Sequence, residues 1–186
     1  MDSITMLYEY KERIALGISF DYGSNHNARE IPFAAMHCER LGIKHIVINL
    51  GFMHQYFKSS LLEGAEAIPE GNYDEENMKS TVVPFRNGIM LSIAAGVAES
   101  NGLKYVMMAN HGGDHTIYPD CRPEFVSAMS EATRQGTYPG IEVLALYRHH
   151  QERHSPPRQG VGHRLCRDLE LLQGWRASLW QVWYLS

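Results

Sequence analysis

Short apolar runs alternate with segments of helical spacing along most of the chain. Four runs are almost entirely apolar and end in polar residues: Ile14–Phe20, Lys44–Gly51, Lys104–Asn110 and Ile141–Leu146. Apolar runs of this length between turn residues are typical of buried strands. Helical spacing is found at 27–42, 52–62, 86–102 and 123–136. The alternation predicts an α/β domain with a parallel sheet that is covered by helices on both faces.

The first predicted element is a helix within residues 1–12, and the first apolar run follows only at Ile14. A doubly wound α/β domain normally opens with a strand. We therefore expect the first strand of the sheet to be missing. In the helix predicted at 86–102, Ile89, Ile93 and Val97 are expected to line one face.

Polar residues concentrate after the first and third predicted strands, at 21–30 and 110–125. Ligands of open parallel sheets bind beyond the carboxyl ends of the strands, so these two loops are the predicted binding site. Residues 63–82 are rich in Gly, Pro, Asn and Glu and are expected to form a long loop, either functional or disordered.

Charge divides the chain into two parts. Residues 1–147 contain 11 Lys and Arg and 18 Asp and Glu, whereas residues 148–186 contain 6 Arg and 3 acidic residues. All nine Met lie in the first part and all three Trp in the second. This change predicts a boundary between a folded domain and a tail of different character.

Three widely spaced cysteines argue against a disulfide framework and favour a reducing compartment. No apolar run approaches the ~20 residues that span a bilayer, and the opening residues do not resemble a signal peptide. These features predict a cytoplasmic protein with no membrane partner.

Three stretches together resemble the 7-cyano-7-deazaguanine synthases. They are FDYGSNHNARE at Phe20–Glu30, VVPFRNGIML at Val82–Leu91 and GDHTIYPDCRPEF at Gly113–Phe125. The resemblance implies a PP-loop ATP pyrophosphatase with a Rossmann-like parallel sheet of the adenine nucleotide alpha-hydrolase type. It implies an incomplete ATP-binding synthase domain at 1–145 and a non-homologous tail at 146–186.

The resemblance also implies a ligase that uses ATP and Mg²⁺ to convert 7-carboxy-7-deazaguanine and ammonia to the nitrile, in queuosine biosynthesis. A carboxylate is a poor acyl electrophile, so adenylation supplies a leaving group. The site must then neutralise the phosphate charge that develops. The implied partners are these small molecules and no nucleic acid, and a homodimer is a family expectation.

The family's phosphate loop reads Ser-Gly-Gly-Met-Asp-Ser, and this chain begins Met1-Asp2-Ser3. By resemblance, Asp2 and Ser3 belong to the nucleotide site, and the missing Ser-Gly-Gly is expected to impair activity. Taken alone, these three residues would be an ordinary chain start with a helix cap.

By resemblance, Asp21, Tyr22 and Gly23 also lie beside the nucleotide, where Gly23 lets the backbone approach closely. The family more often has Gln and Arg where this chain has Ser24 and Asn25, which leaves the roles of these two residues open.

Arg86 and Asn87 open the next helix. The motif implies that Arg86 is catalytic, because its guanidinium can neutralise phosphate, and that Asn87 contacts the nucleotide. The alternative is that Arg86 is a solvated charge on the surface, with no functional role. The family commonly has Gly where Phe85 stands, so the local backbone is expected to differ.

The loop at 113–125 is implied to form the pocket for the deazapurine. Asp114 and Asp120 suit the N–H edge of a guanine-like base, Arg122 suits the substrate carboxylate, and Tyr118 offers a ring and a hydroxyl. Asp114 and Arg122 are therefore candidate catalytic residues as well. The alternative is a Tyr-Pro-Asp turn with a surface ion pair.

The family ends with four cysteines that bind structural zinc, and the tail has none of them in place, so no metal ligand is predicted. One choice of codons for Leu179–Ser186, read one base later, gives Cys-Gly-Lys-Cys-Gly-Thr-Cys. We therefore expect the tail to be out-of-frame translation from near Ala145, and its Trp and Leu residues to be unanchored.

Two other functions stay open on sequence grounds. One is a non-catalytic nucleotide-binding module on the same fold. The other is a metal or nucleic-acid binder that uses the His- and Arg-rich run Arg148–His154.

Overall fold

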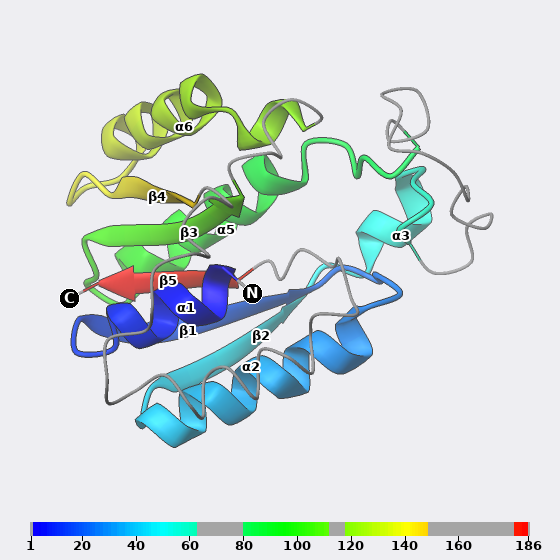
Figure 1. Cartoon of the computed structure of the whole chain (residues 1–186). Coiled ribbons are helices and arrows are strands. Elements are labelled where there is room, and N and C mark those ends of the chain that lie inside the picture. The colour runs from blue at the N-terminus through cyan, green and yellow to red at the C-terminus, as the bar shows by residue number, and fades with distance from the viewer. Residues whose placement is uncertain (1, 63–79, 112–117, 149–180, 186) are drawn as a thin grey trace.

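The computed structural model describes residues 2–62, 80–111, 118–148 and 181–185. Figure 1 shows an α/β arrangement in which helices pack on a central sheet. The elements in chain order are α1 (Asp2–Glu9), β1 (Ile14–Asp21), α2 (Asn27–Leu41), β2 (Lys44–Asn49), α3 (Phe52–Tyr56), α5 (Arg86–Ser100), β3 (Tyr105–His111), the short 3₁₀ helix η2 (Pro119–Cys121), α6 (Pro123–Gly136), β4 (Glu142–Arg148) and β5 (Gln181–Leu185).

The strands form one five-stranded sheet in the order β2-β1-β5-β3-β4. β1 pairs in parallel with β2, with Ile18 opposite Ile46, and β3 pairs in parallel with β4, with Met107 opposite Leu144. β5 is antiparallel to both of its neighbours. The predicted parallel α/β fold is confirmed for the four strands that the apolar runs predicted.

The fifth strand was not predicted. Tail residues 181–185 lie between β1 and β3, at the centre of the sheet. The expectation of an unanchored tail is therefore wrong for the backbone of this segment. The reason is physical, because an extended segment satisfies the hydrogen-bonding groups of two neighbouring strands through its backbone.

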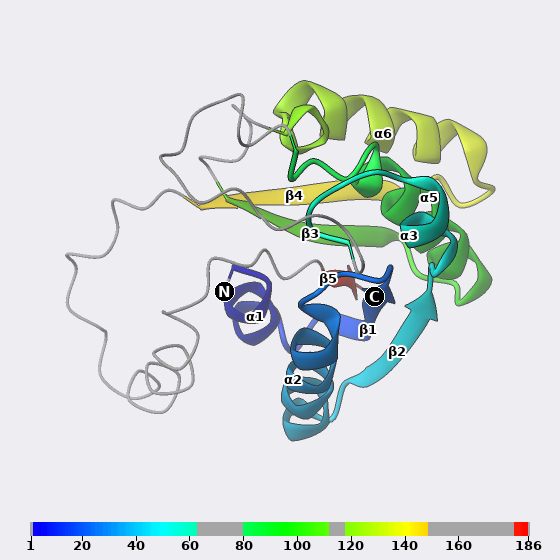
Figure 2. The same ribbon diagram turned by 90° about the vertical axis from the view of Figure 1, so that its right-hand side faces the viewer.

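Helices cover both faces of the sheet (Figure 2). α1 and α2 lie on one face, where Met6, Leu7, Cys38 and Met107 share a buried cluster. α5 and α6 lie on the other face. The larger cluster there includes Leu16, Ile18, Phe20, Leu91, Ala94, Val106, Met108 and Val126.

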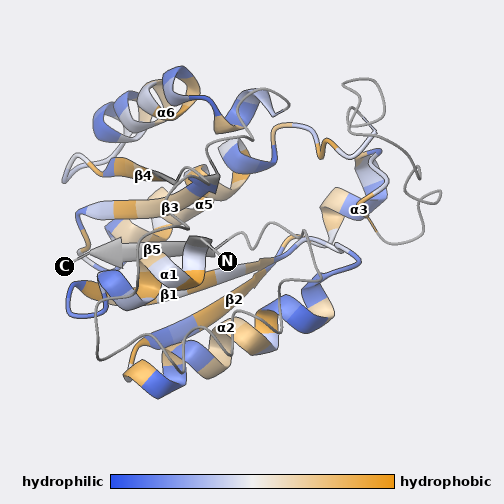
Figure 3. Cartoon of the chain, viewed as in Figure 1, coloured by the Kyte–Doolittle hydropathy of each residue, from blue (hydrophilic) through white to orange (hydrophobic). Residues whose placement is uncertain are grey.

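The edge strand β2 is less buried than predicted. Its residues alternate between exposed and half-buried, and Val47 is 48% exposed. Figure 3 colours the middle of this strand, Ile46–Ile48, as hydrophobic. A strand at the edge of a sheet has a neighbour on one side only, so an apolar run alone does not report complete burial.

One helix prediction needs correction. The helix predicted at 52–62 ends at Tyr56, because Phe57 is extended, with φ −104° and ψ 145°. In α5 the buried face carries Asn87, Leu91, Ala94 and Ala98, whereas Ile89, Ile93 and Val97 are only partly buried. Small Ala side chains let this helix approach the sheet closely, so the bulkier residues lie at the flank of the contact.

The helix predicted at 27–42 is confirmed as α2, and its C-cap Gly42 has φ 69°, the left-handed conformation that favours glycine. None of the helices within the described ranges is long and apolar enough to cross a membrane.

Candidate functional site

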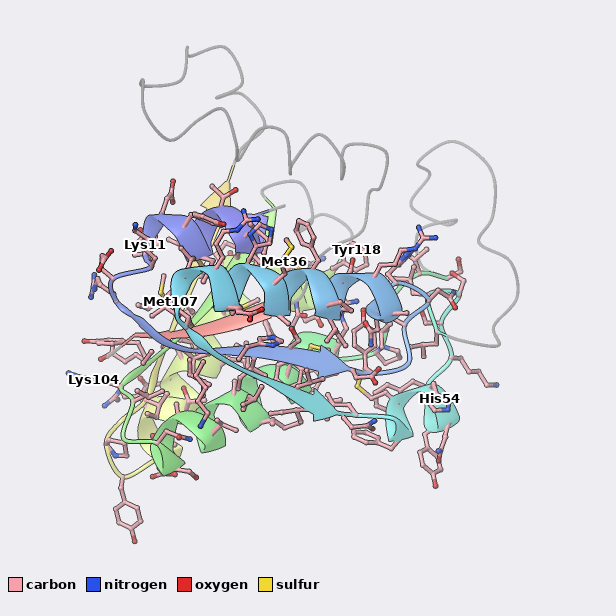
Figure 4. All side chains as sticks on the ribbon, turned by 90° about the horizontal axis from the view of Figure 1, so that it is seen from below. Lys11, Met36, His54, Lys104, Met107 and Tyr118 are labelled. Atoms are coloured by element: carbon pink, nitrogen blue, oxygen red, sulfur yellow. The ribbon has the colours of Figure 1, made fainter. Side chains whose placement is uncertain are left out.

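The predicted site residues gather at the carboxyl ends of β1 and β3. β1 ends at Asp21, α5 begins at Arg86, and η2 follows β3. Figure 4 shows Tyr118 and His54 at the end toward which β1 runs, and Lys11 and Lys104 at the opposite end. α1 leads into β1 through a short turn, so its first residues also lie near the carboxyl end.

Arg86 is buried at this end, with 5% of its surface exposed. Its Nη1 donates a hydrogen bond to the Tyr22 hydroxyl at 3.1 Å, and its Cζ lies 5.5 Å from the centre of the Tyr22 ring. Tyr22 is itself 4% exposed. The alternative of a solvated surface charge is therefore wrong for Arg86. A buried guanidinium held by an aromatic hydroxyl is a fixed cation in a medium of low dielectric constant.

Asp21 is held by the start of α2. The Asn27 Nδ2 donates to Asp21 Oδ1 at 2.9 Å and to the Phe20 carbonyl at 3.4 Å. The backbone N–H of Gly23 also donates to Asp21 Oδ1, at 3.4 Å. One carboxylate oxygen is thus used to fix the loop, while Oδ2 accepts no hydrogen bond from the described residues.

Gly23 adopts φ 74°, which favours glycine. A Cβ at this position would lie 2.9 Å from the Cβ and Nδ1 of His54. The close neighbour in the structure is therefore the side chain of His54 in α3. Whether a nucleotide also approaches Gly23 stays a prediction.

The start of α5 is tied to η2. The Asn87 backbone N–H donates to Asp120 Oδ2 at 2.9 Å, and Asn87 Nδ2 donates to the Asp120 carbonyl at 2.9 Å. From β3, Asn110 Nδ2 donates to the Cys121 carbonyl at 3.3 Å. Asp120 is thus committed to the α5 N-terminus, where a carboxylate also opposes the positive end of the helix dipole.

Phe85 immediately precedes this helix, with φ 49° and ψ 29°. It is the single non-glycine residue with positive φ in the described part of the chain. The backbone at Phe85 therefore adopts a conformation that glycine favours and that strains a residue with a side chain. The exposed Phe85 ring lies 5.7 Å from the Phe125 ring, edge to face, and covers Gly88.

Tyr118 is half-buried, and its hydroxyl shares a 3.1 Å hydrogen bond with the Thr81 Oγ1. This contact joins the segment before α5 to the loop after β3. Arg122, the N-cap residue of α6, is exposed. Tyr118 and Arg122 therefore flank the short η2 turn that contains Asp120, and their contact with a substrate stays a prediction.

Glu30 is a candidate residue that the sequence analysis did not single out. Burial raises the pKa of this carboxyl to about 7, and the nearby charge of Arg86 lowers it in part. A carboxyl that titrates near neutrality is suited to proton transfer. Its position as the last residue of the Phe20–Glu30 motif was the one available signal.

Ser3 is buried in α1, with 2% of its surface exposed. The side chain of Asp2, and Asp114 as a whole, lie outside the part of the chain that the structure describes. So do most of the long loop predicted at 63–82 and the run from position 149 to 154. Within the described ranges, no three His, Cys, Asp or Glu residues are grouped to hold a metal ion.

Comparisons with known proteins identify the family of the chain. The family model described as queuosine biosynthesis protein QueC matches residues 1–152. The 7-cyano-7-deazaguanine synthase of Porphyromonas gingivalis is 61% identical over 147 residues, which cover 79% of this chain and 67% of the relative.

Two further 7-cyano-7-deazaguanine synthases are also similar. That of Desulfotalea psychrophila is 58% identical over 74% of this chain, and that of Hahella chejuensis is 46% identical over 79% of it. The matched part spans 64% of the length of each of these two relatives. Matches of this extent establish that the chain belongs to the QueC family of queuosine biosynthesis enzymes.

Proposed function

We propose that this chain uses ATP and Mg²⁺ to convert 7-carboxy-7-deazaguanine and ammonia into 7-cyano-7-deazaguanine. The observation that carries the proposal is the buried guanidinium of Arg86 at the carboxyl end of the sheet. The names of the relatives supply the reaction, since three of them are 7-cyano-7-deazaguanine synthases at 46–61% identity.

Arg86 is the residue that we assign to the phosphate groups. A guanidinium presents several donors in a rigid fork that matches phosphate oxygens. The hydrogen bond to Tyr22 fixes the direction of this fork before any ligand arrives. ATP would supply the activation of the substrate carboxylate, and Arg86 would stabilise the charge that develops in that step.

Asp21 fits a magnesium ligand. Its Oδ1 is used by Asn27 and Gly23, which holds the carboxylate in place, and its Oδ2 accepts nothing from the described residues. Mg²⁺ is commonly bound by one or two carboxylates together with substrate phosphates. Asp2 and Ser3, at the start of α1, complete the proposed nucleotide site by resemblance.

On the substrate side, Tyr118 and Arg122 are the proposed contacts from the described residues, with Asp114 by resemblance. Asp120 has a double task in this proposal. Its Oδ2 holds the α5 N-terminus through Asn87, so the substrate would meet the other carboxylate oxygen. Arg122 is exposed next to it and offers the cation that the substrate carboxylate needs.

The test is nitrile formation from 7-carboxy-7-deazaguanine, ATP, Mg²⁺ and ¹⁵N-labelled ammonium, followed by mass spectrometry. We expect Arg86→Met to lower kcat/KM at least ~100-fold and Arg86→Lys to restore part of the loss. Arg134→Met is the matched control, because Arg134 is exposed near the far end of α6 and pairs with Glu131.

Two other outcomes decide against the proposal. ATP binding without nitrile would make the chain a nucleotide-binding module. Activity that survives Arg86→Met unchanged would remove the assignment of Arg86.

A further inference from the structure

Two asparagine side chains, one at the start of α5 and one near the end of β3, are buried at the candidate site. Asn87 and Asn110 are each 1% exposed. Within the described residues, the Oδ1 atoms of these two side chains accept no hydrogen bond. A buried acceptor without a donor costs about 1–3 kcal/mol. Such a group in a folded protein calls for an explanation, and a bound ligand is one.

The turn η2 sets the orientation of both amides. Asn87 Nδ2 donates to the Asp120 carbonyl at 2.9 Å and to Cys121 Sγ at 3.4 Å. Asn110 Nδ2 donates to the Cys121 carbonyl at 3.3 Å. A carbonyl oxygen only accepts, so in both amides the nitrogen faces η2 and the oxygen is the atom left over. Because the two carbonyls belong to consecutive residues, the two amides are neighbours on one turn.

The two oxygens require a ligand that donates hydrogen bonds. Phosphate and carboxylate groups do not fit, because their oxygens also accept. The surroundings disfavour a cation, since the guanidinium of Arg86 is buried next to Asn87 in the chain and the N-terminus of α5 carries a partial positive charge. The carboxylate of this turn, Asp120, already accepts from the Asn87 backbone N–H through Oδ2. A neutral ligand with at least two donors meets these conditions.

Burial limits the size of this ligand. Both side chains are almost completely covered, so a heterocycle would reach the two oxygens only by displacing their surroundings. A ligand with a single heavy atom needs no such displacement. We propose that the Oδ1 atoms of Asn87 and Asn110 bind one molecule of ammonia, the nitrogen donor of the proposed reaction, and the inference rests on that proposed function. Neutral acceptors beside a buried cation favour ammonia over ammonium, and only ammonia keeps the lone pair that a nucleophile needs.

The first test needs neither activity nor a variant. The side-chain amide signals of Asn87 and Asn110 in the ¹⁵N-labelled wild-type chain are followed by NMR during titration with ammonium chloride, at alkaline pH where part of it is ammonia. Both signals should shift and saturate. The side chain of Asn101, exposed at the end of α5 with its Nδ2 on the Val97 carbonyl, should not shift. Equal shifts with potassium chloride would mean a cation site, and no shift would mean water alone; either result would overturn the proposal.

The second test is kinetic. Asn110→Leu keeps the approximate shape of the side chain and removes both polar atoms. We expect it to raise KM for ammonium at least about tenfold, with KM for ATP and for 7-carboxy-7-deazaguanine unchanged. Asn101→Leu is the matched control and should alter none of the three. An equal rise in all three constants for Asn110→Leu would mean that Asn110 only anchors η2, and would overturn the proposal.

Pyrophosphate exchange distinguishes failure of this inference from failure of the proposed function. Exchange of labelled pyrophosphate into ATP requires 7-carboxy-7-deazaguanine but no ammonia, so it reports activation of the carboxylate alone. Exchange retained by Asn110→Leu, together with a raised KM for ammonium, supports the ammonia site. Retained exchange with an unchanged KM for ammonium overturns it. A wild-type chain without exchange contradicts the proposed function, and the NMR titration then decides whether the site binds ammonia.

Discussion

The carboxylate of Asp120 accepts a hydrogen bond from the backbone N–H of Asn87, with 2.9 Å between Oδ2 and N. In return, Nδ2 of the Asn87 side chain donates a hydrogen bond to the Asp120 carbonyl, also at 2.9 Å. This reciprocal pair links the start of α5 to η2, and so joins the helix that carries Arg86 to the turn between Tyr118 and Arg122. The proposed nucleotide and substrate halves of the site are one connected unit.

Replacing Asp120 with Ala removes the acceptor at the α5 N-terminus. We expect the free energy of unfolding to fall by about 1 kcal/mol, as for the loss of other helix N-terminal acceptors. Asp120→Asn keeps an acceptor and loses the charge, so its cost should be smaller. Urea unfolding of the three proteins at neutral pH measures both differences.

The same pair separates a structural role from contact with the substrate. If Asp120 also binds the deazapurine, Asp120→Asn should raise KM for that substrate while the free energy of unfolding changes little. An Asp120→Ala protein as stable as the wild type would mean that the bond to Asn87 does not hold the turn.

Tyr22→Phe tests the support of Arg86. The substitution removes the hydroxyl that accepts from Arg86 Nη1 and leaves the ring under the guanidinium. A hydrogen bond to a charged buried group contributes about 1.5–3 kcal/mol, so Tyr22→Phe should destabilise by an amount in this range. Tyr8→Phe, at a hydroxyl that contacts His37 on the opposite face of the sheet, serves as the comparison.

A loss of nucleotide affinity in Tyr22→Phe, with Tyr8→Phe unaffected, would tie the bond to ligand binding. Equal stability of Tyr22→Phe and the wild type would show that the hydroxyl does not support Arg86.

Sequence patterns were sufficient for the frame of the fold but not for its centre. The apolar runs before Asp21 and His111 gave the parallel strands, because burial on both faces leaves a signal in composition. Gln181–Leu185 also contains strand-forming residues, Val182, Trp183 and Tyr184, but its place in the sheet depends on its pairing with β1 and β3. This pairing depends on the positions of β1 and β3 in the folded chain, which the five residues alone do not specify.

The candidate site shows the same division. The motifs brought Tyr22, Arg86 and Asp120 together, and the structure places all three at one end of the sheet. The motifs did not predict which partner each side chain contacts. Asp120 looks like a base-recognising carboxylate in the sequence, yet its partner in the structure is Asn87, because an acceptor at a helix start depends on which loop lies beside it.

At position 85 we expect glycine to be more stabilising than alanine, the reverse of the usual order within a helix. Its φ of 49° is favourable for glycine and costs other residues about 1 kcal/mol. Phe85→Ala and Phe85→Gly both lose the ring contact with Phe125, so the difference between them isolates the backbone. We expect Phe85→Gly to be more stable than Phe85→Ala by about 1 kcal/mol, by thermal or urea unfolding.

At Gly96, inside α5 and with open space around it, the ordinary ranking should hold. Gly96→Ala should stabilise the protein, by about 0.5–1 kcal/mol. If alanine is the better residue at both positions, the left-handed conformation of Phe85 does not exist in solution.

The tail hypothesis has a test at the level of the gene. If residues 146–186 are out-of-frame translation, the DNA read one base later should encode the Cys-Gly-Lys-Cys-Gly-Thr-Cys run in place of Leu179–Ser186. Sequencing of the locus decides this without any protein. A next frame that lacks the cysteines would end the hypothesis, and it would leave the pairing of Gln181–Leu185 with β1 and β3 unaffected.

Glu30 makes the stability of the protein depend on pH. Its pKa is raised by burial from 4.5 to about 7 in the folded chain, so the folded state holds this proton more tightly than the unfolded state. The stabilising contribution of the protonated carboxyl is complete below pH 4.5 and is lost as the pH rises through 7.

Glu30→Gln mimics the protonated form and should remove this dependence of stability on pH. At pH 8 it should be more stable than the wild type by about 3 kcal/mol, since the shift is about 2.5 pKa units and each unit corresponds to about 1.4 kcal/mol. Urea unfolding at pH 5 and pH 8 gives the comparison, with Glu39→Gln on the exposed side of α2 as the control that should show no such difference. Parallel stability curves for Glu30→Gln and the wild type across this range would mean that the carboxyl is ionised and solvated at neutral pH, and would remove Glu30 from the candidate site.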